Sequence, residues 1–164
     1  MSITEAWLRG PIDGVPPVLQ PVAHALVQAN EEVAALLPGL SADLLWTSRG
    51  AATAGFHVLH MAGALDRLFT YARGEALNDT QKAELRAEGQ PHPEIDAAAL
   101  IATLDAAIAR ALVQLRHTDA ARVFDERKVG RAGLPSSVLG LLFHAAEHTT
   151  RHAGQLVTTI KLRT

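Results

Sequence analysis

The most constraining feature of the sequence is a regular spacing of apolar side chains that recurs in four separate segments. Residues 95–116 show it most clearly, with leucine or isoleucine at Leu100, Leu104, Ile108, Leu112 and Leu115. Such spacing places the apolar residues on one face of an α-helix, and that face is buried by packing against other helices. Helical spacing also marks residues 18–37, 53–73 and 135–161. The sequence therefore predicts an all-α protein built as a four-helix bundle.

The size and composition of the chain agree with this fold class. A chain of 164 residues has the usual size of one domain, so we expect residues 1–164 to form a single unit. Alanine and leucine are abundant and aromatic residues make up only 4% of the chain, which favours helices that pack through small side chains.

Two segments between the predicted helices differ in character. Residues 75–94 are charged and end in Gln90-Pro91-His92-Pro93, which predicts a crossing connection that acts as a linker because proline discourages a continuous helix. Residues 117–134 mix apolar and charged side chains with two glycines, and either an irregular loop or a short extended piece satisfies this pattern.

Composition also excludes several classes of function. The formal charge is −2, with both signs interspersed, so neither nucleic acid nor an anionic membrane is an expected partner. The chain has no cysteine, which excludes disulfides, thiolate zinc sites and a cysteine nucleophile. Residues 1–14 lack the pattern of a secretion signal, and the apolar run at residues 134–146 is too short to span a bilayer. We therefore expect a cytoplasmic protein.

Three histidines at intervals of four residues lie within the last predicted helix: His144, His148 and His152. A step of four residues turns about 40° around a helix, so side chains at this spacing share one face and two imidazoles can bind one metal ion. His148 and His152 belong to a stripe that points into the bundle, with Leu141, Ala145, Leu156 and Thr159. His144 lies at the edge of this stripe and is a candidate only for supporting contacts.

One helix usually offers only two such ligands, so a third must come from a facing helix. His57 and His60 lie in the second predicted helix. Helical projection alone places His57 slightly deeper and so favours it as the third ligand. A single pair of histidines is more often a hydrogen-bonded feature of the core edge, but paired clusters on two helices favour a metal site. The histidines that stand alone in their segments receive no role: His24, His92 and His117.

Two motifs resemble those of the DinB/YfiT-like metalloenzymes, the DinB superfamily. Residues 148–155 read His-x-x-x-His-x-Gly-Gln, and residues 60–68 place a histidine before small residues, an acidic residue and a leucine. The resemblance extends over essentially the whole chain, and it implies a metal triad of His60, His148 and His152. It differs around the last ligand, where family members often carry histidine and arginine and this chain has Arg151 and Ala153.

The resemblance further implies an up-up-down-down bundle, a homodimer, and a divalent ion such as zinc or nickel with open positions for water. Relatives include transferases of low-molecular-weight thiols and a thiol-dependent isomerase, so the implied activity is a thiol-dependent S-transferase reaction on a small-molecule substrate. Three neutral ligands also suit a metal-dependent hydrolase. A non-catalytic metal-binding protein of stress response or protein interaction is an alternative of a different class.

Near the triad, the sequence offers few groups for general acid or base catalysis. Glu147 projects about 100° away from His148 around the helix, so a structural role on the solvent side is expected for it. Gln155 lies one turn beyond His152 and could orient its imidazole, although a packing role fits it equally well.

Overall fold

Four long helices dominate the structure, which is a computed structural model that describes residues 4–48 and 50–162. They are α1 (Gln20–Leu36), α3 (Ala54–Ala72), α5 (Ala97–His117) and α6 (Val138–Lys161). Each lies within a few residues of a segment with predicted helical spacing. The prediction of an all-α fold with four principal helices is therefore confirmed.

Local sequence signals explain where three of these helices begin. Thr53, Asp96 and Ser137 each accept a hydrogen bond from the backbone N–H three residues further on, at 3.1, 2.8 and 3.0 Å. Side-chain oxygens at these positions satisfy N–H groups that have no partner within the helix. Gly74, whose φ is +82°, follows the last turn of α3 and ends that helix as predicted.

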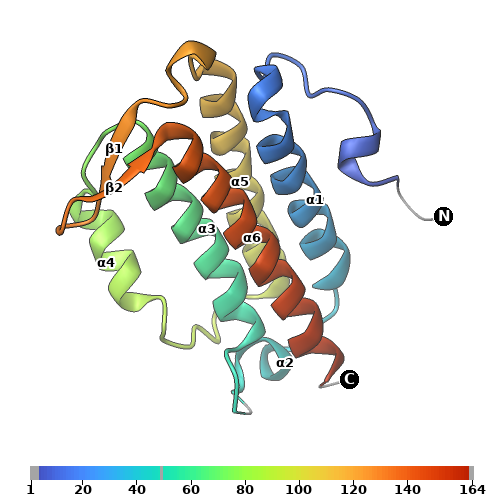
Figure 1. The fold of residues 1–164 in the computed structure, drawn as a ribbon. Helices are drawn as coiled ribbons and strands as arrows, with labels where there is room; N and C mark the ends of the chain where they lie inside the picture. Colours follow the sequence, from blue (N-terminus) through green and yellow to red (C-terminus); the bar gives the residue numbers. More distant parts are fainter. Residues whose placement is uncertain (1–3, 49, 163–164) are drawn as a thin grey trace.

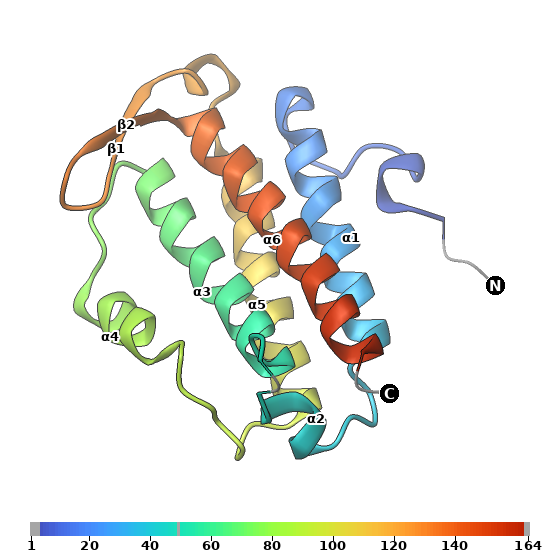
Figure 2. The same cartoon turned by 60° about the horizontal axis from the view of Figure 1, so that its bottom comes forward.

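The apolar faces of the four helices meet in one continuous core. Its largest fully buried side chains include Leu26 and Val33 from α1, Met61 and Leu65 from α3, Leu100, Leu104 and Leu115 from α5, and Leu142 and Leu156 from α6. Helix α3 packs against both α5 and α6, and α1 packs against the same two helices on the opposite side of the bundle (Figures 1 and 2).

The direction of the helices corrects one expectation. Contacts of His57 with His152 and of His60 with His148 show that α3 and α6 are antiparallel. Helices α3 and α5 point in one direction, and α1 and α6 point in the opposite direction (Figure 1). The order along the chain is therefore up-down-down-up and not up-up-down-down. The reason lies in the segment between α3 and α5, which crosses the length of the bundle before α5 begins.

This crossing connection contains a helix that the sequence did not predict. Helix α4 (Asp79–Ala87) lies beside α3 on the outside of the bundle (Figure 2). It begins with a capping box, in which Asn78 and Gln81 exchange hydrogen bonds with each other's backbone N–H groups. The prolines at residues 91 and 93 follow its end, so they do not oppose it. Because α4 is short and polar, it lacks the apolar spacing by which longer helices are detected.

The remaining elements are short. Helix α2 (Ala42–Trp46) joins α1 to α3, and single 3-10 turns occupy Ala6–Leu8, Pro17–Leu19 and Ala120–Arg122. The segment left undecided between loop and extended piece contains strand β1 (Glu126–Val129), which pairs antiparallel with β2 (Leu134–Ser137). The last long helix therefore begins three residues later than predicted, because residues 135–137 belong to β2.

One helix among the described residues has the length and apolar composition of a membrane span, namely α5. A core helix of a soluble protein meets the same two criteria, and α5 buries one of its faces against α3 and α1.

The contact between Gly55 and Trp46 yields a prediction about stability. A Cβ atom at Gly55 would lie 2.4 Å from the ring of Trp46, which is buried and donates a hydrogen bond of 2.8 Å to the carbonyl of Ile95. Gly55→Ala should lower the free energy of unfolding by about 1–3 kcal/mol, as expected for overpacking of a buried site.

Urea unfolding followed by circular dichroism measures this change. Gly154→Ala is the matched control, because a Cβ at that helical glycine meets nothing within 4 Å. It should leave stability unchanged or raise it by roughly 0.5–1 kcal/mol. Equal midpoints for Gly55→Ala and the wild type would contradict the proposed packing.

Candidate metal centre

The two predicted pairs of histidines face one another across the contact between α3 and α6. Because these helices are antiparallel, His60 meets His148 and His57 meets His152. The Nε2 atoms of His60 and His148 lie 2.9 Å apart, and the Nδ1 atoms of His57 and His152 lie 3.0 Å apart. Four imidazoles from two helices thus form one cluster.

Three of these histidines can share one ion. His60, His148 and His152 each offer one nitrogen, and these nitrogens all lie within 4.8 Å of one another. Two nitrogens bound to a tetrahedral zinc ion at its usual bond length lie roughly 3.3 Å apart, so small rotations of the rings bring all three into range. All three residues are half-buried. The donor set therefore fits a divalent cation.

His57 is the most buried member of the cluster, with 5% of its surface exposed, as the helical projection indicated. It nevertheless stands outside the triad and contacts His152 through Nδ1. A neutral imidazole carries one N–H, so when His152 donates from Nδ1 to His57, the Nε2 lone pair of His152 is free for a metal. His57 is thus placed to orient the ring of His152.

Burial disfavours the charged form of three of these imidazoles, those of His57, His148 and His152. It lowers the pKa of His152 to about 4, with the positive charge of His60, when protonated, as the next cause. The pKa values of His57 and His148 are lowered by the same two causes in the same order. At neutral pH these imidazoles are neutral, which is the form that binds a metal.

A carboxylate that sequence reasoning assigned to a linker also reaches the cluster. Glu88, just after α4, accepts a hydrogen bond of 2.8 Å from Nδ1 of His60 and another of 2.5 Å from Arg67. Burial alone would raise the pKa of Glu88, but the hydrogen bonds from His60 and Arg67 outweigh it and hold that pKa below its ordinary value. No local motif in the sequence identifies this contact, because it depends on the position of α4.

The other candidates lie outside the centre of the cluster. His144 is exposed and lies 3.3 Å from Glu147, which also pairs with Arg151, so Glu147 has the surface role expected for it. Gln155 lines a neighbouring cavity and is exposed. The three isolated histidines take part in contacts elsewhere: His24 with Gly10, His92 with Glu94 and Trp46, and His117 with Val113.

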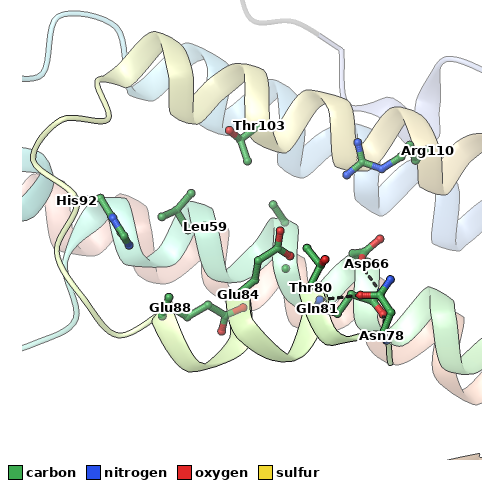
Figure 3. Close-up of a pocket in the computed structure, with 13 residues that line it drawn as sticks. Leu59, Asp66, Asn78, Thr80, Gln81, Glu84, Glu88, His92, Thr103 and Arg110 are labelled. Atoms are coloured by element: carbon green, nitrogen blue, oxygen red, sulfur yellow. Dashed lines mark hydrogen bonds between the residues drawn. The ribbon is translucent and has the colours of Figure 1, made fainter. Parts of the chain in front are cut away.

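Two cavities flank the cluster. One, of about 710 Å³, opens beside His57 and His152 and is also lined by Phe56, Gln155 and Thr159. The other, of about 640 Å³, lies between α3, α4 and α5 on the side of Glu88 (Figure 3). Only the first is lined by a member of the triad, so it is the better candidate for a substrate pocket.

Comparison with known proteins shows the family and the fold of the chain. The sequence model of the DinB superfamily matches residues 25–156. A crystal structure described as the conserved protein of a locus from Enterococcus faecalis has a TM-score of 0.69, with 19% identity over 88% of this chain and 96% of that chain. At this identity the likeness shows the fold alone. No curated protein matches the chain.

The lowered pKa of His152 predicts how the stability of the metal-free protein depends on pH. The unfolded chain protonates this residue near the ordinary pKa of 6.5, and the folded chain does so only near 4. Between these values the unfolded state binds more protons, so the free energy of unfolding should fall as the pH is lowered from about 6.5 to about 4. The groups around His152 are His57, His60, His148 and Arg151.

Thermal unfolding in the presence of a chelator, over this pH range, measures the effect. His152→Gln should show a shallower decline than the wild type, because the group with the largest shift is gone. His117→Gln, at the exposed end of α5, should keep the wild-type decline. Parallel curves for the wild type and His152→Gln would rule out this explanation.

Proposed function

The chain belongs to the DinB superfamily, and on that premise we propose that it is an enzyme that uses a divalent ion held by His60, His148 and His152. The convergence of these three imidazoles from α3 and α6 is the observation that carries the proposal. Zinc and nickel are the proposed ions, because imidazole nitrogen suits both.

The site has the features of a catalytic centre more than of a structural one. Three ligands leave at least one position open on a tetrahedral ion, whereas structural zinc sites are closed by four protein ligands. The cavity of about 710 Å³ next to His152 offers room for a small-molecule substrate, and Phe56 supplies an apolar wall. When bound, a divalent ion with neutral ligands lowers the pKa of a coordinated thiol or water near neutral pH.

Among the chemistries open to such a centre, thiol-dependent S-transfer is the one we propose. Hydrolysis benefits from a general base beside the attacking water. The two described carboxylates that approach the triad are already engaged, Glu88 with His60 and Arg67, and Glu147 with Arg151 on the surface. A thiol has an ordinary pKa of about 8.5, against about 15.7 for water, so it ionises at a metal with less need of such a base. This difference favours a low-molecular-weight thiol as co-substrate, with metal-dependent hydrolysis as the second candidate.

The role of the chain's own residues follows from their contacts. His57 and Glu88 each contact one ring of the triad and hold it in place. Phe56 stacks on the ring of His60, with centroids 5.1 Å apart and planes within 10° of each other. These contacts fix the donor atoms before an ion binds, which reduces the ordering that binding requires.

Two further properties are proposed: a homodimer, which the family resemblance implies, and a location in the cytoplasm, which the sequence pattern predicts. The alternative of a different class, a metal-binding protein of stress response or interaction without turnover, uses the same three histidines. A measurement of catalytic activity distinguishes this non-catalytic alternative from the proposed enzyme.

Metal content is the first test. Untagged protein analysed by plasma mass spectrometry should contain about one ion per chain, and the double variant His148→Ala, His152→Ala should contain none, because only one ligand remains. Chelation should lower the thermal midpoint of the wild type, since an ion bound only by the folded state stabilises it.

His117→Ala is the control for the loss of a histidine elsewhere and should retain the ion. Absence of metal in the wild type, together with no binding of added zinc or nickel, would overturn the proposal.

Activity with a thiol is the second test. Zinc-loaded protein should accelerate the reaction between a small thiol, such as cysteine, and a chromogenic electrophile. With the double variant, the same reaction should proceed at the uncatalysed rate. Turnover of an activated ester without thiol would instead favour the hydrolase, and metal binding without either activity would favour the non-catalytic protein.

A further inference from the structure

The connection between α3 and α5 contributes a side chain to the candidate metal centre. We infer that Glu88 is a positioning residue, which holds His60 in the one neutral form whose Nε2 can bind an ion. The inference rests on the proposed metal site and extends it to a segment that the sequence indicated only as a linker.

The hydrogen bond between Glu88 and His60 determines which nitrogen carries the proton. An ionised carboxylate only accepts hydrogen bonds, so the 2.8 Å contact places the N–H of His60 on Nδ1. A neutral imidazole has one N–H, and Nε2 therefore keeps its lone pair. That atom is the one that faces the cluster, 2.9 Å from Nε2 of His148.

Arg67 fixes the orientation of the carboxylate itself. Its guanidinium donates to Oε1 of Glu88, while Oε2 accepts from His60, so each oxygen has a defined partner. The side chains of Arg67 and Glu88 are each only 10% exposed. Charged groups at this depth are found in pairs, because an isolated charge is costly to bury. Arg67 thus keeps Glu88 ionised and pointed at His60.

Gly63, which lies between His60 and Arg67 on α3, leaves room for the carboxylate of Glu88. His60, Gly63 and Arg67 follow one another at helical spacing on one face of α3. A Cβ atom at Gly63 would lie 2.4 Å from Oε1 of Glu88 and 2.8 Å from Arg67. Glycine is unfavourable inside a helix compared with alanine, and here its missing side chain is the space that Glu88 occupies.

A neighbouring carboxylate provides a matched comparison. Glu84 lies one turn earlier on α4 and extends into the same cavity toward α5, whereas Glu88 lies near the end of the helix (Figure 3). Its side chain is exposed and has no hydrogen-bond or ionic partner among residues 4–48 and 50–162. Loss of its charge therefore changes the cavity without changing the contact to His60.

The test compares Glu88→Gln with Glu84→Gln. Arg67 has only donors, so in Glu88→Gln it should take the amide oxygen and leave the amide nitrogen facing Nδ1 of His60. The ring should then switch its N–H to Nε2. We expect zinc affinity, measured by competition with a chromophoric chelator, to fall by about 10- to 100-fold in Glu88→Gln and to stay unchanged in Glu84→Gln.

The tautomer of His60 provides a readout that a merely structural ion pair would not give. Nitrogen NMR of the metal-free protein, assigned with His60→Gln, should show N–H at Nδ1 in the wild type and in Glu84→Gln, and at Nε2 in Glu88→Gln. Gly63→Ala is a second variant in case Glu88→Gln folds poorly. It displaces the carboxylate and retains its charge, and it should also weaken zinc binding.

The outcomes separate two failures. Wild-type zinc affinity and an Nδ1 tautomer in both Glu88→Gln and Gly63→Ala would overturn the role of Glu88 and leave the metal site intact. No zinc binding by the wild type would overturn the proposed function, and the tautomer of the metal-free protein would still decide whether Glu88 controls His60.

Discussion

The antiparallel packing of α3 against α6 is the contact on which the candidate site depends. Each helix contributes to this contact two histidines about one turn apart, which supply at most two ligands to an ion. Because the helices run in opposite directions, the first histidine of each pair faces the second histidine of the other pair. His57 therefore faces His152, and His60 faces His148. Parallel helices in the same contact would have matched these residues differently.

The contacts around the triad show how a polar cluster is tolerated at the edge of an apolar core. No buried side-chain nitrogen or oxygen among the described residues lacks a hydrogen-bond partner. Within the cluster, histidines are partners for one another, and Glu88 and Arg67 extend the network to α4. Lowered pKa values keep His148 and His152 uncharged, so the cluster avoids the cost of burying several positive charges.

The sequence by itself determined the properties that local spacing encodes. Apolar residues at every third or fourth position identified four long helices, and histidines at the same spacing identified the two helix faces that meet. The choice between His57 and His60 came from the family resemblance, because the projection of an isolated helix ranks only depth. In the structure His57 is indeed deeper, yet His60, with His148 and His152, forms the group that could hold an ion.

Tertiary structure alone decided the direction of the helices, the position of α4 and the contact of Glu88 with His60. These features join residues far apart in the chain, and a charged, proline-containing connection gives no local signal of where it crosses the bundle. A short polar helix is stabilised by its capping box and by the surface it covers, and neither produces a periodic apolar pattern. Local spacing can therefore identify candidate ligands, whereas the residues that orient them depend on how the whole chain packs.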